Sequence, residues 1–253
     1  MMKAVRKVFT SVLFAFLCAP VAQAETATIG VAANFAGAAR ALASDYREES
    51  GHNIRISIGS TGSLFTQIAM GAPFDIFMAA DQTRPESIEQ FGLGVEGTRM
   101  TYAVGYITLW AADPNQFEDG LSALQAADFR YLAMANPDVA PYGLAAKEAL
   151  EHYGLWDSLQ DHIVIGENIA QTYVMVDSFN AELGFVATSS IVSADNDYGV
   201  TWEVPLEAYN PIRQDAILLK HGENNEAAIG FLEYLKSDAA AAILGFYGYG
   251  SAE

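Results

Sequence analysis

Cysteine is almost absent from the chain. Its one cysteine, Cys18, lies close to the N-terminus, and the 253 residues hold no second cysteine for a disulfide. A disulfide framework is therefore excluded, and a chain of this length has to gain its stability from a buried core. If the segment around Cys18 is removed during maturation, a thiol nucleophile is excluded as well.

Basic residues are also scarce. The chain has 13 lysines and arginines against 31 aspartates and glutamates, which gives a formal net charge of −18 at pH 7. Without a basic stripe to neutralise phosphates, nucleic-acid binding is excluded. An acidic surface also repels small anions at long range. A site for an anion would therefore have to attract its ligand with local dipoles rather than with the overall field.

The first 24 residues have the pattern of a secretory signal peptide. Three basic residues, Lys3, Arg6 and Lys7, precede an apolar stretch over residues 8–21. Residues 22–24 are Ala-Gln-Ala, a small-x-small cleavage signal. We expect cleavage after this signal and export to the periplasm. Loss of the three basic residues would take the net charge from −18 to −21.

Two other interpretations of this segment are weaker. A buried first helix would not explain why a basic start and an Ala-x-Ala end occur together. Lipidation at Cys18 would require a small residue before it, where the chain has Leu17. No later segment sustains 18 apolar residues without a charge, so we expect a soluble mature protein without membrane insertion.

Hydrophobic periodicity predicts an α/β fold. Short runs rich in β-branched residues alternate with stretches of helical periodicity, which is typical of mostly parallel sheets flanked by helices. Strands are expected at residues 28–32, 54–58, 75–79, 131–135, 162–165, 183–187 and 215–219, and an apolar run covers residues 102–111. Helices are expected at residues 35–50, 64–70, 85–91, 144–153, 170–179, 225–236 and 239–246. Two α/β units therefore follow one another.

The two units are expected to form two lobes. No spacer rich in Pro, Ser or Gly separates them, which favours lobes joined by crossing strands over two independent domains. One continuous sheet is the alternative. We place lobe 1 at residues 25–104 and 208–253 and lobe 2 at residues 105–207. Hinge motion is expected near residues 101–105 and 209–211.

Four strand-to-helix junctions are candidates for an anion site. They lie at residues 32–35, 59–63, 141–143 and 167–170, two in each half of the chain. The start of a helix has free N–H groups and a partial positive charge, so it can bind an anion without lysine or arginine. Any one junction could equally be an ordinary cap or tight turn. Facing each other at the carboxyl ends of the strands, the four would form a cage of donors.

The sequence lacks the patterns of a catalytic site. The four histidines, His52, His152, His162 and His221, do not have the spacing of metal ligands, and no Gly-x-Ser-x-Gly motif is present. Residues 59–63 lack the lysine of a nucleotide-phosphate loop. We therefore predict neither a metal site nor an enzyme. A periplasmic hydrolase of phosphate or sulfate esters is the alternative from the enzyme class.

Five segments at and near these junctions carry a family resemblance. They are residues 59–68 (GSTGSLFTQI), 71–81 (GAPFDIFMAAD), 141–143 (PYG), 146–150 (AKEAL) and 154–157 (GLWD). Together they resemble the periplasmic molybdate-binding proteins of ABC importers, which have a fold like the type II periplasmic binding proteins. The resemblance extends over nearly all of the mature chain.

The resemblance implies a function and a set of contacts. It implies a two-lobed fold that holds a tetrahedral dianion, molybdate or tungstate, in the cleft between the lobes and delivers it to the membrane permease of an ABC importer. The family's ligand contacts correspond to Asn34, Thr61, Tyr142 and the backbone N–H of Ile169, with Ser60 and Ala33 beside them. No cofactor is implied, and no metal ion except the metal within the oxyanion. We expect a monomer, because a protein that docks on a transporter gains nothing from covering its lobes.

The chemistry of these positions favours a fully deprotonated dianion. Phosphate keeps a proton that needs a carboxylate acceptor, and none of the motif positions is acidic, although Asp138 and Glu167 are close in sequence. A protein acceptor that is buried against an oxyanion, with no proton between them, weakens binding by several kcal/mol. Molybdate and tungstate are therefore ranked first, sulfate second and phosphate well behind.

One position departs from the family pattern. Where many members have a tyrosine after Leu-Gly-x-Val, this chain has Ala187, which removes one donor. Tyr142 is a candidate substitute, because its ring could bring a phenol to the oxygen that Ala187 leaves without a partner. Packing of Tyr142 over the mouth of the cleft is the alternative.

Overall fold

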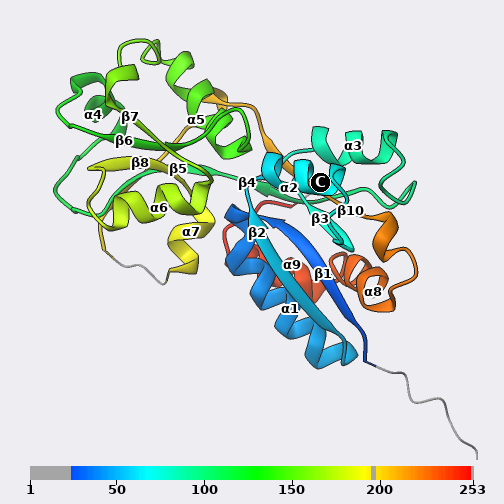
Figure 1. Cartoon of the computed structure of the whole chain (residues 1–253). Coiled ribbons are helices and arrows are strands. Elements are labelled where there is room, and N and C mark those ends of the chain that lie inside the picture. The colour runs from blue at the N-terminus through cyan, green and yellow to red at the C-terminus, as the bar shows by residue number, and fades with distance from the viewer. Residues whose placement is uncertain (1–23, 195–197, 252–253) are drawn as a thin grey trace, which may run out of the picture.

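A computed structural model describes residues 24–194 and 198–251, and Figure 1 shows its two lobes. The predicted signal peptide, residues 1–24, lies outside the described residues except for Ala24. Within the described part of the chain, no helix combines the length and the apolar character that a membrane crossing requires.

The first lobe is built on a five-stranded sheet. Its strands, in spatial order, are β2 (Asn53–Gly59), β1 (Thr26–Ala32), β3 (Ile76–Met78), β10 (Ile212–Leu218) and β4 (Met100–Gly105). Strand β1 pairs in parallel with β2 and β3, whereas β10 is antiparallel to both of its neighbours. One strand of the sheet therefore runs against the other four.

The second lobe repeats this arrangement. Its strands, in spatial order, are β7 (Ile163–Gly166), β6 (Leu132–Ala135), β8 (Leu183–Ala187), β5 (Ile107–Ala111) and β9 (Val200–Glu203). Strand β6 pairs in parallel with β7 and β8, and β5 is the strand that runs against the others. The predicted mostly parallel sheets are confirmed, and the alternative of one continuous sheet is wrong.

Helices cover both faces of each sheet. In the first lobe they are α1 (Ala36–Ser50), α2 (Thr61–Ala69), α3 (Thr83–Gln90), α8 (Glu226–Tyr234) and α9 (Asp238–Phe246); in the second they are α4 (Gly120–Ala126), α5 (Pro141–His152), α6 (Ile169–Asp177) and α7 (Thr188–Ser193). Alternate residues of a strand point to opposite faces. Ile76 and Met78 therefore pack in the core with α1, α8 and α9, while Phe77 packs with α2 and α3.

Two segments connect the lobes. The apolar run at residues 102–111 is divided at Tyr106: Gly105 pairs with Ile212 in the first sheet, and Ile107 pairs with Ala187 in the second. The chain returns after β9, and Ala208 and Tyr209 still pack in the core of the second lobe. The crossings thus lie at Tyr106 and at residues 210–211, within a few residues of the predicted lobe bounds and hinges (Figure 1).

Candidate functional site

A small cavity lies between the lobes. It encloses about 200 Å³ of empty space, including its open mouth. Its lining consists of Ala32, Ala33, Asn34, Ser60, Thr61, Ala80, Ala140, Pro141, Tyr142, Asn168 and Ile169. All six residues that the sequence predicted for an oxyanion site, Asn34, Thr61, Tyr142, Ile169, Ser60 and Ala33, are in this lining.

The first lobe contributes two helix starts to the cavity. A short 3-10 helix, Ala33–Phe35, follows β1, and α2 follows β2 directly after Ser60. The Ser60 hydroxyl oxygen accepts a hydrogen bond from the Ser63 N–H at 3.3 Å, and Thr61 Oγ1 accepts one from the Ala80 N–H at 3.0 Å. A hydroxyl has one proton of its own. Because both oxygens are occupied as acceptors, both protons can be donated to an acceptor in the cavity.

Helix α5 of the second lobe leaves one amide free in its first turn. Pro141, at the first helical position, has no N–H. The N–H groups of Gly143 and Leu144 both bond to the Ala140 carbonyl, at 2.9 and 3.0 Å. The first amides of a helix have no partner within it. Among the described residues, none outside the helix accepts from the Tyr142 N–H, which is therefore available to a ligand.

Helix α6 is capped in a way that spares a single amide. The Asn168 side chain accepts from the N–H groups of Ala170 and Gln171, at 3.0 and 3.1 Å. The Thr172 N–H bonds to the Asn168 carbonyl at 3.2 Å. Of the amides in the first turn, only the Ile169 N–H takes no part in these bonds. Its residue lines the cavity and is 3% exposed.

The cavity is neutral and rich in donors. Within the described chain, none of its lining residues carries a charge, and Tyr142 is the one lining residue that can titrate. Burial raises the pKa of the Tyr142 phenol well above its ordinary value, so the phenol stays uncharged. The starts of α2, α5 and α6 add partial positive charge. The cavity can thus attract an anion without lysine or arginine, although the whole chain is acidic.

The two lobes touch beside the cavity. The Gly62 N–H of α2 donates to the Val139 carbonyl of the second lobe at 2.8 Å. Arg84 of α3 donates from Nη2 to the Asp138 carbonyl at 3.0 Å and also pairs with Asp81. Backbone contact across the cleft means that the structure is a closed conformation.

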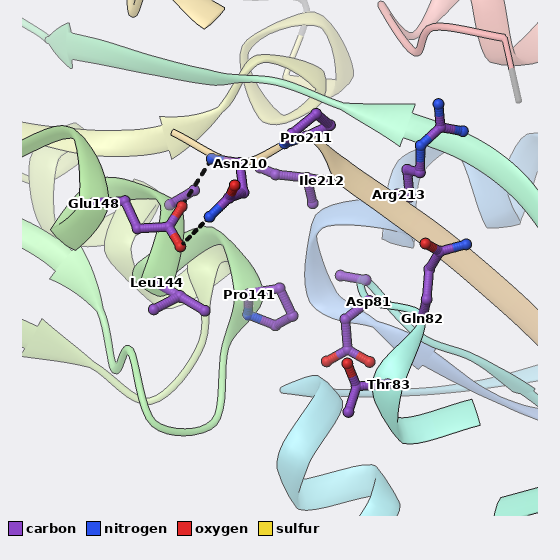
Figure 2. A pocket seen from close by; sticks show the side chains of 12 residues that line it. Asp81, Gln82, Thr83, Pro141, Leu144, Glu148, Asn210, Pro211, Ile212 and Arg213 are labelled. Atoms are coloured by element: carbon purple, nitrogen blue, oxygen red, sulfur yellow. Dashed lines mark hydrogen bonds between the residues drawn. The ribbon is translucent and has the colours of Figure 1, made fainter. Parts of the chain in front are cut away.

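A groove adjoins the cavity and shares Ala80 and Pro141 with it. Figure 2 shows side chains of both lobes around this groove, with the returning crossing along one side. Glu148 of α5 accepts hydrogen bonds from the backbone N–H and the side-chain amide of Asn210, at 2.8 and 2.9 Å. These bonds, dashed in Figure 2, fasten the second crossing to the helix that carries Tyr142.

The structure also surrounds the site with polar residues that sequence reasoning missed. Gln214 and Tyr249 of the first lobe and Ser189 of the second hydrogen-bond to Asn34. None of these three residues was singled out from the sequence. These residues lie far from Asn34 in the sequence, and only the folded chain brings them to it.

Tyr142 is the candidate substitute for the donor missing at Ala187, and its hydroxyl lies among side chains of the first lobe. Ala187 is fully buried at the end of β8. The Tyr142 hydroxyl accepts from Asn34 Nδ2 at 3.2 Å and from Gln214 Nε2 at 3.3 Å. Replacement of the missing donor by Tyr142 stays a prediction.

Gly62→Ala is expected to weaken the oxyanion binding predicted from the sequence. A Cβ at Gly62 would lie 3.0 Å from the Cα and Cβ atoms of Val139 and 3.1 Å from its carbonyl oxygen. Overpacking costs about 1–3 kcal/mol. Because Val139 belongs to the other lobe, the cost falls on the closed form, and affinity measured by calorimetry should drop roughly 5- to 150-fold.

Gly245→Ala is the matched control. Gly245 lies in α9, and a Cβ there would meet nothing within 4 Å. The control should bind the oxyanion as the wild type does. Without ligand, both variants should melt close to the temperature at which the wild type melts. Wild-type affinity in Gly62→Ala would show that closure does not bring Gly62 against Val139.

Comparison with known proteins places this site in a family. The family model described as bacterial extracellular solute-binding protein matches residues 27–250. The molybdate-binding protein ModA of Azotobacter vinelandii is 43% identical over 239 residues, 94% of this chain and 95% of the relative. That of Rhodobacter capsulatus is 40% identical over 87% of this chain and 86% of its own. The solved structure of the Azotobacter vinelandii periplasmic molybdate-binding protein superposes with a TM-score of 0.86 at 35% identity, over 90% of this chain and all of that one. The chain belongs to the family of bacterial extracellular solute-binding proteins.

Proposed function

We propose that this protein captures molybdate or tungstate between its lobes and delivers it to an ABC importer. The observation that carries the proposal is the convergence of helix starts from both lobes on one uncharged cavity. The relatives named as molybdate-binding proteins match it over nearly their whole length. Their names support the choice of ligand, and the cavity supports the choice of an oxyanion.

The donor inventory supports a fully deprotonated oxyanion. Hydroxyl protons of Ser60 and Thr61 and the amides of Tyr142 and Ile169 are donors, and no carboxylate lines the described cavity. A tetrahedral dianion such as molybdate, tungstate or sulfate offers only acceptors. Phosphate at neutral pH carries a proton that would lack an acceptor, at a cost of about 1–3 kcal/mol. Sulfate is the second candidate, and phosphate is disfavoured.

The contacts follow from the same inventory. We assign the anion to the Ser60 and Thr61 hydroxyls and to the main-chain N–H groups of the helix starts. Those starts carry Ala33, Asn34, Thr61, Tyr142 and Ile169. Because the donors are divided between two lobes, the ligand stabilises the closed form and exchanges in an open one.

A binding role in the periplasm fits the remaining features. A signal peptide at residues 1–24 would export the chain, and a monomer would leave both lobes free to dock on a permease. Across residues 24–194 and 198–251, no group of three or more His, Cys, Asp or Glu is placed to hold a metal ion.

Calorimetry with a panel of anions at equal ionic strength tests the ligand. Molybdate and tungstate should bind most tightly, sulfate more weakly and phosphate far more weakly. At a thousandfold excess over Kd, the preferred ligand should add about 4 kcal/mol to the free energy of unfolding and raise the melting temperature. Equal binding of phosphate and molybdate would overturn the dianion argument. Turnover of model esters would revive the hydrolase.

A pair of N-cap serines separates binding from helix capping. Ser60 caps α2 and Ser237 caps α9, each accepting one backbone N–H, at 3.3 and 3.1 Å. Replacing either serine with alanine should cost about 0.5–2 kcal/mol of stability. Only Ser60→Ala also removes a donor to the anion, so its molybdate affinity should fall roughly tenfold or more. Equal affinities of Ser60→Ala and Ser237→Ala would remove Ser60 from the site.

A further inference from the structure

A buried polar network lies under the cavity, and Asn34 is at its centre. Asn34 Nδ2 lies 2.8 Å from Gln214 Oε1, 3.2 Å from the Tyr142 hydroxyl and 3.2 Å from the Tyr249 hydroxyl. The Asn34 main-chain carbonyl accepts from the Ser189 hydroxyl at 3.0 Å and from the Tyr249 hydroxyl at 2.9 Å. The side-chain amino group of Asn34 is thus committed to other protein groups.

The network joins the two lobes. Asn34, Gln214 and Tyr249 belong to the first lobe, whereas Tyr142 is on α5 and Ser189 on α7 of the second. Four of its hydrogen bonds cross the cleft: Asn34 to Tyr142, Gln214 to Tyr142, Ser189 to Asn34, and Tyr249 to Ser189. Bonds of this kind exist only while the lobes are together.

The Tyr142 hydroxyl fits into a notch of the first lobe. Gly105, the last residue of β4 before the crossing, leaves the space, because a Cβ there would overlap the hydroxyl. Gln214 forms another wall of the notch, next to a register shift between Gln214 and Asp215. Asp215, the next residue, accepts hydrogen bonds from Thr101 and Arg99 instead. Gln214 therefore belongs to the network around Asn34, and Asp215 does not.

All members of the network are removed from solvent. Gln214 is 0% exposed, Tyr142 2% and Asn34 3%. Burial also raises the pKa values of the Tyr142 and Tyr249 phenols, so both stay uncharged. In the network the Tyr142 hydroxyl accepts hydrogen bonds and the Tyr249 hydroxyl donates them. A buried polar group without a partner costs more than a hydrogen bond contributes. Any one deletion in a network that forms on closure should therefore disfavour the closed form.

We propose that Gln214 and Tyr249 are positioning residues that lock the closed lobes by holding Asn34 and the Tyr142 hydroxyl. The proposal rests on the proposed function. In it, Asn34 and Tyr142 offer the oxyanion their main-chain N–H groups, and their side chains form the lock. The competing assignment makes the Tyr142 hydroxyl a donor to the ligand. The lining of the cavity does not include Gln214 or Tyr249, so their effect on binding has to pass through Asn34 and Tyr142.

A double-mutant cycle between Gln214 and Tyr142 tests the lock. Gln214→Met keeps the length of the side chain and removes its polar atoms, and Tyr142→Phe removes only the hydroxyl. Each should weaken molybdate binding about tenfold, which corresponds to about 1.4 kcal/mol. The double variant should also lose only about tenfold, because both changes disrupt one network: each removes the Gln214–Tyr142 bond and a bond to Asn34 Nδ2. The loss should appear as faster dissociation in stopped-flow measurements, with little change in the association rate.

Tyr234→Phe is the matched control for the loss of a phenol. The Tyr234 hydroxyl donates to Asp45 Oδ2 at 2.7 Å, and both residues belong to the first lobe. This variant should lose stability without a change in dissociation rate. Either of two results would overturn the lock: a Gln214→Met affinity within twofold of the wild type, or losses that multiply to about a hundredfold in the double variant.

Small-angle scattering can test the lock independently of which ligand the protein binds. Wild-type protein and Gln214→Met are compared without ligand and with saturating molybdate. If the wild type binds none of the oxyanions tested, the proposed function fails, and the ligand-free profiles decide on the lock. Gln214→Met should then be the less compact of the two. Identical radii of gyration under that condition would reject the lock on its own.

Discussion

An anion buried in an acidic protein has to be held by dipoles, and this constraint shapes the whole cleft. With a formal net charge of −18, the chain brings no lysine or arginine into the described cavity. Its donors are hydroxyls and first-turn amides, which carry partial positive charge at no cost in buried ions. Free amides of this kind are found where helices begin. The strands that lead into these helices must therefore end at the cleft in both sheets. The repeated strand order of the two lobes achieves this arrangement.

Dividing the donors between two bodies couples binding to closure. The closed cleft is held by the backbone bond of Gly62 to Val139 and by the buried network around Asn34. Two glycines make the close approach possible, Gly62 against Val139 and Gly105 against the Tyr142 hydroxyl. The ligand's share of the closing free energy is what distinguishes one oxyanion from another, while the network favours closure with any ligand.

The elements of the fold were largely predictable because strands and helices have strong local patterns. Helix starts were less so: α2 was expected at residue 64 and begins at Thr61, and α5 was expected at residue 144 and begins at Pro141. In both helices the first turn is formed by residues that are typical of loops. These are Gly62 in α2, and Pro141 and Tyr142 in α5. The elements α4, α7 and β9 were not predicted. Gln214 and Ser189 could not be predicted, since their importance comes from contacts between distant segments.

The most direct test of the account is the position of the anion. Crystals grown with tungstate and measured near a tungsten absorption edge would locate the metal by its anomalous signal. The account predicts one dominant peak in the cavity between the lobes. The oxyanion's oxygens should lie about 2.7–3.2 Å from the N–H nitrogens of Thr61, Tyr142 and Ile169. A dominant peak on one lobe alone, or beside surface lysines and arginines with the cavity empty, would contradict it.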